Sequence, residues 1–356
     1  MAKAYKVTGL MSGSSLDGVD LACCTFIRNR GEWSFDIIAS ETLPYPGELI
    51  TRLHNASNRS MEDIRILDDE LGQYYGELIN QFHSRNNLLP DLIASHGHTI
   101  LHEPGKGITV QAGNGRIMAN VTGVSVVSDF RKEDVAQGGE GAPLVPVGDR
   151  LLFGEYDACL NLGGFANVSY EGEDRQRIAF DVGPANMALN WIAGLMHQDF
   201  DRDGAISRSG KVDRVLLKEL NELDFYGLEP PKSLGREWFL VSFLPILKRA
   251  KLDPADLMAT VSEHIAVQIS GCLNKLSSGS VLVTGGGAMN LALVEKIEHL
   301  LDLQMVIPDQ QIIEYKEALI FALLGLLRVL GEINTLSSVT GGKSDLSAGT
   351  VSMVNR

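Results

Sequence analysis

Three glycine-containing turns constrain the fold of this chain more than any other feature of its sequence. Each follows an apolar segment that predicts a β-strand, and the turns comprise residues 13–18, 163–167 and 285–290. Successive backbone N–H groups in such turns form concave sites for anions, and glycine lets phosphate oxygens approach because it has no Cβ. For any one of them, an ordinary tight turn is the alternative. Neither GxxxxGK[ST] nor GxGxxG occurs, so a P-loop and a Rossmann dinucleotide site are disfavoured.

The pattern of strand, glycine turn, strand and strand occurs twice in the chain. Apolar and alternating segments predict strands at residues 6–11, 19–27 and 33–40, and again at 158–162, 167–170 and 178–181. A strand at 280–284 leads into the third turn, and an amphipathic helix at 316–330 is expected to return the chain to the first domain. We therefore predict an α/β fold with a duplicated core, in which the domains comprise residues 1–127 plus 316–356 and residues 128–315.

Composition and charge narrow the class of protein. The 356 residues suffice for two domains at ~150 residues each, and 44% hydrophobic residues support sizeable cores. A net charge of −14 disfavours nucleic acid and anionic membranes as partners. The N-terminus has no signal-peptide core, and the longest apolar stretch, 318–330, is shorter than the ~20 residues of a membrane span. Four cysteines without metal-ligand spacing are expected to be free thiols, so a cytoplasmic protein is predicted.

Asp181 is the first candidate for a catalytic group. It closes the apolar segment 178–180 and precedes Gly183-Pro184, so a carboxylate is expected at a strand end. A carboxylate at neutral pH is already in the basic form that a general base requires. The alternative is an N-cap of the helix that is expected to begin near Pro184.

Asp129 and Arg131 follow the predicted strand 124–127, where side chains are expected to reach a crevice. Because an arginine forms paired hydrogen bonds with a carboxylate, Arg131 is a candidate for binding an acidic substrate. The alternative is a salt bridge between this pair and neighbours such as Glu133 or Asp134.

Glu317 and two histidines are further candidates with structural alternatives. Glu317 falls in the first turn of the helix predicted from Lys316, where an acid is also simply favourable to the helix dipole. His96 and His98 flank Gly97 at a strand end, and a metal site is disfavoured because the sequence places no third ligand beside them. Contact with substrate or a role in the turn is expected instead.

Eight blocks, in order from about residue 7 to residue 342, carry a resemblance to a known family. They are Gly9–Asp20, Ser95–Thr99, Asp129–Arg131 with Gly138–Pro146, Asn161–Asn167, Phe180–Asn186, Lys232–Glu237, Thr284–Asn290 and Glu317-Ala318. The duplicated glycine hairpins are typical of the actin-like ATPase and sugar-kinase class. Within that class, the chain resembles the anhydro-N-acetylmuramic acid kinases over nearly its whole length.

The resemblance implies a fold and a reaction. The fold is two similar domains of the actin-like ATPase (ribonuclease H-like) type with a nucleotide cleft between them. The reaction is ATP-dependent, hydrolytic opening of 1,6-anhydro-N-acetylmuramic acid and its phosphorylation to N-acetylmuramic acid 6-phosphate, in peptidoglycan recycling. Mg²⁺ is expected with ATP, because phosphoryl transfer needs its charge neutralised. A homodimer is expected, and the alternatives are another small-molecule kinase of the same fold or a nucleotide-dependent conformational switch protein.

The matching blocks also imply roles for individual residues. Asp181 corresponds to the general base, and the substrate-binding residues are His96, Asp129, Arg131 and Glu317. The three glycine turns supply the predicted ATP-binding residues, which are Gly13, Ser14, Ser15, Leu16, Asp17, Gly18, Val19, Asp20, Gly163, Gly164, Asn167, Gly285, Gly286, Gly287 and Asn290. The metal ligands stay open among Asp17, Asp20 and Asp181.

The sequence departs from the family pattern at four positions. Ser14 stands where the family usually has Thr, His98 where it has Gln, Ala185 where it has Gly and Asn190 where it has Asp. These changes leave the implied reaction class intact and concern the contacts with substrate.

Overall fold

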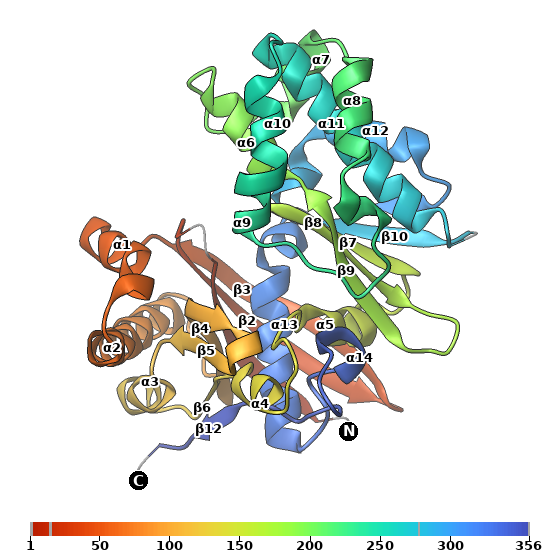
Figure 1. Ribbon diagram of the computed structural model, residues 1–356. Coiled ribbons are helices and arrows are strands. Elements are labelled where there is room, and N and C mark those ends of the chain that lie inside the picture. The colour runs from red at the N-terminus through yellow and green to blue at the C-terminus, as the bar shows by residue number, and fades with distance from the viewer. Residues whose placement is uncertain (1–2, 14–15, 277, 355–356) are drawn as a thin grey trace. The chain divides into compact units, whose positions relative to one another are not determined.

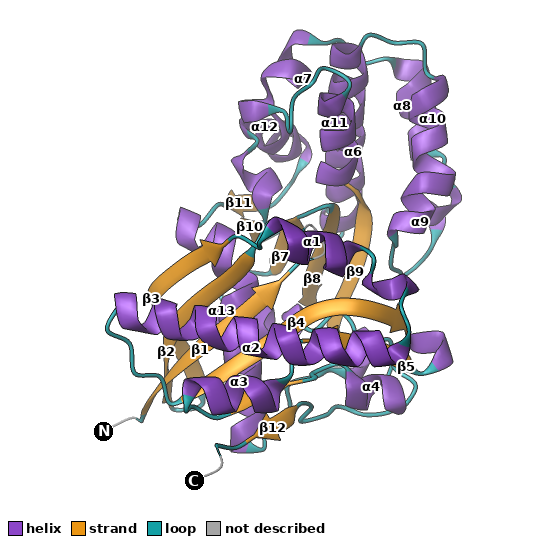
Figure 2. Ribbon diagram, turned by 90° about the vertical axis from the view of Figure 1, so that its left-hand side faces the viewer, coloured by secondary structure: helices purple, strands orange, loops and turns teal. Residues whose placement is uncertain are grey.

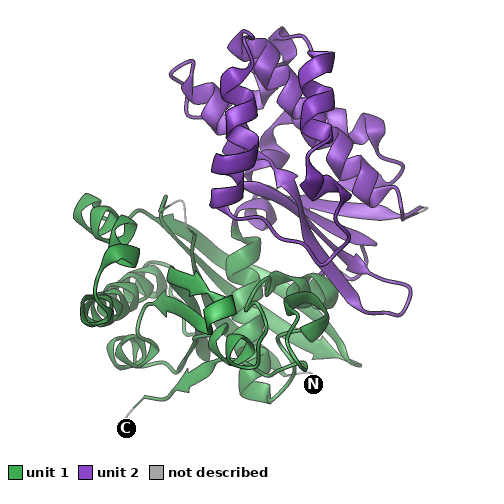
Figure 3. Cartoon of the chain, viewed as in Figure 1, with its two compact units in different colours: residues 1–152, 315–356 green, residues 153–314 purple. Residues whose placement is uncertain are grey.

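The computed structural model describes residues 3–13, 16–276 and 278–354 (Figure 1). The chain divides into two compact units, residues 1–152 with 315–356 and residues 153–314 (Figure 3). The second boundary lies one residue from the predicted one. The first lies about 25 residues later than the predicted boundary near Ser128, for reasons that the packing of unit 1 explains.

Unit 1 contains one mixed sheet and the helices that cover it. Its strands are β1 (Ala4–Ser12), β2 (Val19–Asn29), β3 (Glu32–Leu43), β4 (Leu92–Glu103), β5 (Ile108–Ala112), β6 (Val126–Ser128) and β12 (Thr350–Ser352). Its helices are α1 (Gly47–His54), α2 (Met61–Arg85), α3 (Gly115–Thr122), α4 (Lys132–Ala136), α5 (Val145–Leu152), α14 (Ser337–Thr340) and most of α13 (Gln310–Leu330).

The sheet of unit 1 is covered on both faces. Figure 2 shows α2 and α3 in front of the sheet and α13 behind it. Ser60 begins α2 as its N-cap and accepts a hydrogen bond from the Asp63 N–H at 3.1 Å. On the other face, a Cβ at Gly9 would lie 1.9 Å from the Ala318 carbonyl oxygen, so α13 lies directly against the backbone of β1.

Packing against this sheet explains why the chain stays in unit 1 beyond Ser128. Strand β6 lies inside the sheet, between β4 and β12, and therefore cannot end the domain. Helix α5 then packs on α13, because Gly148 leaves room for the Ile320 side chain. Lys316 and Asp149, both buried, form an ion pair at 2.7 Å in the same contact.

Unit 2 contains a five-stranded sheet and most of the remaining helices. Its strands are β7 (Ala158–Leu162), β8 (Phe165–Glu171), β9 (Arg177–Pro184), β10 (Ser280–Thr284) and β11 (Gln304–Val306). Its helices are α6 (Asn186–Gly194), α7 (Ala205–Ser209), α8 (Arg214–Asn221), α9 (Arg236–Trp238), α10 (Leu244–Arg249), α11 (Pro254–Leu273) and α12 (Leu291–Leu300).

The two sheets share one strand order. Unit 1 runs β3-β2-β1-β4-β6 and unit 2 runs β9-β8-β7-β10-β11, with β12 and β5 added only in unit 1. In both, the first three strands in sequence pair antiparallel and the next two join in parallel. This repeat is the ribonuclease H-like topology of the actin-like ATPases, so the predicted fold class is confirmed. Within the described residues, no helix has the length and apolar character that a membrane crossing needs.

Candidate functional site

A row of polar side chains crosses the sheet of unit 2. Asn161 on β7 lies opposite Asn167 on β8, which in turn lies opposite Asp181 on β9, and Thr284 on β10 pairs with Asn161. Residues directly opposite each other in a sheet share a face. Their neighbours along the strands, such as Leu162 and Val182, belong to the helical core on the other face. The row therefore lies on the face away from that core.

Asp181 is held in this row by backbone contacts. Register between β8 and β9 shifts beside Asn167, so Val182 forms a bulge directly after Asp181. The Asp181 carboxylate accepts a hydrogen bond from the Leu234 N–H at 2.8 Å, and the Asp181 N–H donates to the Lys232 carbonyl at 3.1 Å. Burial raises the pKa of Asp181 to about 6, although the Leu234 hydrogen bond opposes the shift.

The alternative role of Asp181 as a helix cap is wrong. Helix α6 has Ala185 as its N-cap residue, and no side chain accepts a hydrogen bond there. Among the described residues, the carboxylate therefore accepts one hydrogen bond, from the Leu234 N–H. It remains able to take up a proton as a base.

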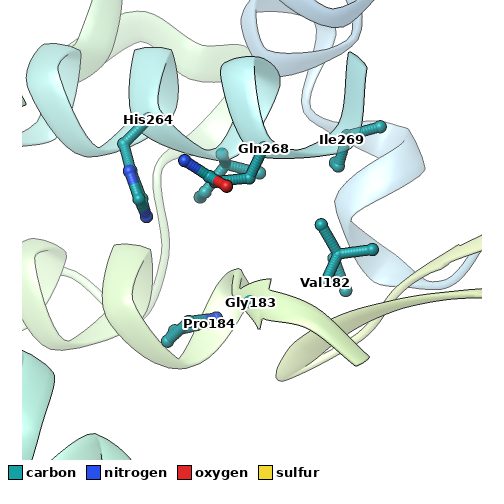
Figure 4. A pocket seen from close by; sticks show the side chains of 8 residues that line it. Val182, Gly183, Pro184, His264, Gln268 and Ile269 are labelled. Carbon is teal, nitrogen blue, oxygen red and sulfur yellow. The ribbon is translucent and has the colours of Figure 1, made fainter. Parts of the chain in front are cut away.

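A buried network supports the end of β9 from the core side. The Tyr226 hydroxyl donates to His264 Nε2 at 2.7 Å, and His264 Nδ1 donates to the Asn221 side-chain oxygen at 2.6 Å. Burial lowers the pKa of His264 to about 3, so the ring is neutral. Figure 4 shows His264 and Gln268 of α11 facing Gly183 and Pro184 across a small pocket. A Cβ at Gly183 would lie 3.1 Å from the Tyr226 hydroxyl, so the network packs tightly on this strand.

The second and third glycine turns meet at the start of α6. The Asn186 N–H donates to the Gly163 carbonyl at 3.1 Å, and its side-chain amide donates to the Leu162 carbonyl at 2.8 Å. In the third turn, Gly286 approaches the same Asn186 side chain. Two segments about 120 residues apart in sequence thus form one glycine-lined surface, as the strand order predicts.

The glycines of this surface differ in whether the protein's own packing leaves room for a Cβ. Gly285 has φ +82°, and a Cβ there would lie 2.5 Å from the Asn161 side chain, while a Cβ at Gly287 would lie 2.7 Å from Leu162. At Gly164 and Gly286 the nearest atoms would be 3.8 and 3.7 Å from a Cβ, which is ordinary contact, and both residues are exposed. Only the first pair is therefore required by the protein's own packing.

The remaining predicted nucleotide residues of unit 2 have structural partners. Asn290 caps α12, since its side-chain oxygen accepts a hydrogen bond from the Leu293 N–H at 3.1 Å. Asn167 lies beside Asp181 in the polar row. Contact of either side chain with nucleotide stays a prediction.

The first glycine turn is described only in part, because Ser14 and Ser15 lie outside the described residues. Gly13 precedes them, and Leu16 and Asp17 follow. A Cβ at Gly18 would lie 2.8 Å from the Thr42 methyl group, so this glycine packs against β3. Val19 is buried, and Asp20 accepts a hydrogen bond from Thr42 Oγ1 at 2.7 Å.

Arg131 is oriented by neutral partners in unit 1. Its Nε and Nη2 donate to His96 Nε2 at 3.1 and 2.8 Å, and its Nη1 donates to the Gly141 carbonyl at 2.6 Å. Because His96 Nε2 accepts, the ring proton is on Nδ1, which donates to the Gly97 carbonyl at 2.9 Å. Burial lowers the pKa of His96 well below its ordinary value and that of Arg131 to about 10. At neutral pH the imidazole is uncharged and the guanidinium is charged.

The alternative of a local salt bridge holds for Asp129 but not for Arg131, which forms no ion pair with Glu133 or Asp134. The Asp134 carboxylate instead accepts hydrogen bonds from the Gly141 N–H and the Thr340 hydroxyl, both at 2.8 Å, and fixes the loop whose carbonyl binds Arg131. Asp129 has φ +60° and pairs with Lys132 at 2.7 Å.

Glu317 lies in the interior of α13 and not in its first turn. The helix begins at Gln310, six residues before the predicted start, and the Asp309 side chain accepts from the Ile312 N–H at 2.9 Å. The helix-dipole alternative for Glu317 is therefore wrong. Its side chain keeps an exposed surface, and partial desolvation raises its pKa, an effect that the Arg131 guanidinium opposes.

His96 and His98 point to different helices and cannot form a metal pair. The His96 ring lies 4.7 Å from the Phe321 ring of α13, whereas His98 Nδ1 bonds to Ser12, in contact with the tyrosines on the α2 side. A register shift between β1 and β4 at this point separates them. The described residues hold no cluster of three or more His, Cys, Asp or Glu side chains suited to a metal ion.

Comparison with known families settles the relationship of the chain. The model of the family described as "Anhydro-N-acetylmuramic acid kinase" matches residues 5–353. The chain belongs to the anhydro-N-acetylmuramic acid kinase family. The resemblance carried by the eight sequence blocks is thereby confirmed.

Curated relatives in the anhydro-N-acetylmuramic acid kinase family cover almost the entire chain. The protein of that name from Pseudomonas syringae pv. syringae is 35% identical over 94% of this chain and 95% of its own length. The one from Haemophilus influenzae is 36% identical over 96% of both. Among solved structures, component A of (R)-2-hydroxyglutaryl-CoA dehydratase from Acidaminococcus fermentans covers 92% of this chain and 99% of its own, at 13% identity and a TM-score of 0.47.

Sequence reasoning missed several groups that shape this family member's site. Asn161 carries a local signal, because it interrupts the apolar strand β7 on the same face as Asp181. The Leu234 N–H and the Gly141 carbonyl leave no such signal in the sequence, because both are backbone groups. Folding brings them to Asp181 and Arg131 from 53 and 10 residues away, respectively.

Proposed function

We propose that the chain catalyses ATP-dependent hydrolytic opening of 1,6-anhydro-N-acetylmuramic acid and phosphorylation of its O6, giving N-acetylmuramic acid 6-phosphate for peptidoglycan recycling. That the chain is a kinase, and thus a phosphotransferase, follows from its family. The observation that carries the proposed chemistry is Asp181, a carboxylate beside the bulge of β9 with a pKa of about 6 and one N–H partner among the described residues.

Asp181 acts in this proposal as the general base. It takes a proton from a water molecule as the water oxygen attacks the anomeric carbon of the sugar. The bond between that carbon and O6 breaks. O6 then attacks the γ-phosphorus of ATP, and ADP is the leaving group. A base whose pKa lies near the working pH is both deprotonated and basic enough for this transfer. The bulge at Val182 and the Leu234 N–H fix the carboxylate so that its position is set before substrate binds.

Arg131 binds the lactyl carboxylate of the sugar in this proposal, because a charged guanidinium forms paired hydrogen bonds with carboxylates. Glu317 and Asp129 are proposed to contact the sugar as well. His96 is proposed to act through Arg131, since both of its ring nitrogens already have protein partners.

The glycine turns are proposed to bind ATP through their backbone N–H groups. Mg²⁺ is proposed to accompany the phosphates, where it neutralises their charge, and Asp17 and Asp20 of the first turn are oxygen donors of the kind that Mg²⁺ prefers. Use of ATP and the free thiols of Cys23, Cys24 and Cys272 favour a cytoplasmic location. The homodimer stays a prediction, and light scattering should give twice the chain mass of 38.7 kDa.

The function is tested by measuring ADP release with the anhydro sugar, with open N-acetylmuramic acid and with no sugar. Release is expected only with the anhydro sugar, and the product mass should equal substrate plus one water plus one phosphoryl group. Equal turnover on the open sugar would indicate an ordinary sugar kinase. Full turnover without sugar would indicate a nucleotide-driven switch protein.

The rate should depend on the protonation of Asp181. Because its pKa is raised to about 6, we expect kcat/KM to be constant above about pH 7 and to fall as the pH drops through 6. A raised carboxyl pKa means that the folded state tolerates the protonated form, so this loss should precede acid unfolding. Circular dichroism at each pH provides the control. A rate that stays flat to pH 4.5 in folded protein would contradict the assignment.

Replacing Arg131 should weaken sugar binding selectively. Arg131→Lys keeps the charge but loses the paired geometry, so KM for the sugar is expected to rise about tenfold, the equivalent of one charged hydrogen bond. KM for ATP should not change. Arg116→Lys, at an exposed position on α3, is the matched control. If both variants have the wild-type KM for the sugar, Arg131 does not bind its carboxylate.

A further inference from the structure

Four buried groups in unit 1 form a hydrogen-bonded chain that ends at His98. The hydroxyls of Tyr75 and Tyr45 lie 2.6 Å apart, Tyr45 lies 2.7 Å from Ser12 Oγ, and Ser12 lies 3.0 Å from His98 Nδ1. Tyr75 comes from α2, Tyr45 from the segment before α1, Ser12 from the end of β1 and His98 from β4. None of the four is more than 5% exposed.

The hydrogen-bond partners give the protons in this chain a preferred direction. A buried hydroxyl has one proton and needs an acceptor for it. Burial aside, the hydrogen bond between the two phenols raises the pKa of Tyr75 and lowers that of Tyr45, as expected when Tyr75 donates to Tyr45. The Tyr45 proton then goes to Ser12, and the Ser12 proton goes to His98 Nδ1.

The ionisation of these groups agrees with that direction. Burial raises the pKa of Tyr45 to about 12 and that of Tyr75 well above its ordinary value, so both phenols keep their protons. Burial lowers the pKa of His98 to about 4, so its ring is neutral at pH 7. With Nδ1 accepting, the ring proton is on Nε2.

The Nε2–H group of His98 is a donor with no partner in the described part of the chain, although the ring is buried. We propose that this N–H donates a hydrogen bond to an acceptor oxygen of the bound sugar and makes His98 a specificity-determining residue. The inference rests on the proposed function. His98 lies two residues after His96 on β4, and His96 orients Arg131, the residue proposed to bind the lactyl carboxylate of the sugar.

The hydrogen-bonded chain gives this contact a fixed polarity. Because the Tyr45 and Ser12 protons hold Nδ1 as the acceptor, the opposite nitrogen is always a donor. A sugar that presents an oxygen acceptor is favoured there, and one that presents only N–H or ammonium donors is rejected, since two donors cannot pair. Tyr45 and Ser12 are positioning residues in this scheme.

Enzyme kinetics on the full chain test the contact. His98→Phe keeps the ring and removes the donor, so KM for the anhydro sugar is expected to rise about tenfold, with KM for ATP unchanged. His98→Gln supplies a new N–H and should recover most of the affinity. Tyr45→Phe should raise KM for the sugar several-fold, because Ser12 is then free to accept from His98. Tyr74→Phe is the matched control: its phenol donates to the Pro44 carbonyl and lies outside the chain of four.

Nitrogen-15 NMR of the imidazole tests the polarity without any substrate. The proton of His98 is expected on Nε2 in the wild type, and on a mixture of both nitrogens in Tyr45→Phe. A proton on Nδ1 in the wild type, or a His98→Phe variant that raises KM for ATP in place of KM for the sugar, would overturn the inference. If the wild type itself does not turn over the anhydro sugar, the proposed function fails with it, whereas wild-type turnover with an unaffected His98→Phe variant removes this inference alone.

Discussion

Asp181→Asn is expected to lose about 10²- to 10⁴-fold in kcat, the usual contribution of a general base. The amide keeps the size of the side chain, and its oxygen can still accept the hydrogen bond from the Leu234 N–H. It cannot accept a proton from water. Steady-state ADP release with saturating anhydro sugar measures the loss, and ATP binding measured by calorimetry should stay within a few-fold of the wild type.

The design of this experiment separates chemistry from folding. Because burial already disfavours the charged form of Asp181, a neutral amide should not lower the melting temperature. Asp174→Asn changes an exposed carboxylate in the turn between β8 and β9 and should leave both rate and stability unchanged. An Asp181→Asn variant with more than about a tenth of the wild-type rate would exclude Asp181 as the base.

Gly286→Val is expected to weaken ATP binding about a hundredfold while the protein stays folded, and Gly164→Val should act in the same way. Loss of two hydrogen bonds to a charged phosphate is worth roughly 3 kcal/mol, which corresponds to this factor. The fold should survive, because a Cβ at either position meets no atom closer than 3.7 Å. Nucleotide titration and a melting curve measure the two quantities.

Two control variants separate an effect on ATP binding from an effect on folding. Gly227→Val places the same side chain at an exposed site of unit 2 with no atom within 4 Å and should change neither quantity. Gly285→Val should instead lower the melting temperature, because φ is +82° and Asn161 would be 2.5 Å from the new Cβ. Wild-type ATP affinity in folded Gly164→Val and Gly286→Val would mean that these are ordinary turns.

The duplicated strand pattern was predictable because it follows from the local pattern of apolar residues. Apolar segments such as 158–162 and 280–284 are strands for reasons that neighbouring residues decide, and the glycines between them mark the turns. The same reasoning placed Arg131 after β6, but it predicted that Asp181 ends its strand, whereas β9 continues to Pro184. The sequence reasoning also missed the first six residues of α13, because the segment from Gln310 onward is polar. This segment is nevertheless helical, and Asp309 caps it.

The finer geometry depends on contacts between distant segments, which periodicity does not contain. The bulge at Val182 arises from pairing with β8, and the shift at His96–Gly97 arises from pairing with β1. Each changes which side chains share a face. The sequence also makes all glycines of the turns look alike, whereas Gly285 is required by Asn161 and Gly286 is not. Such distinctions need the packed structure.

The partners of Arg131 have a consequence for discrimination between related sugars. Its hydrogen bonds go to a neutral imidazole and a carbonyl, so no carboxylate among the described residues occupies its donors. In the proposed reaction, an anhydro sugar without the lactyl group would leave this half-buried cation without a bound carboxylate on its donors as water is displaced. Such a mismatch costs more than the loss of one favourable contact, because a desolvated charge goes unpaired. The neutral analogue would therefore be rejected because of the electrostatic cost of desolvating Arg131 without a carboxylate to bind.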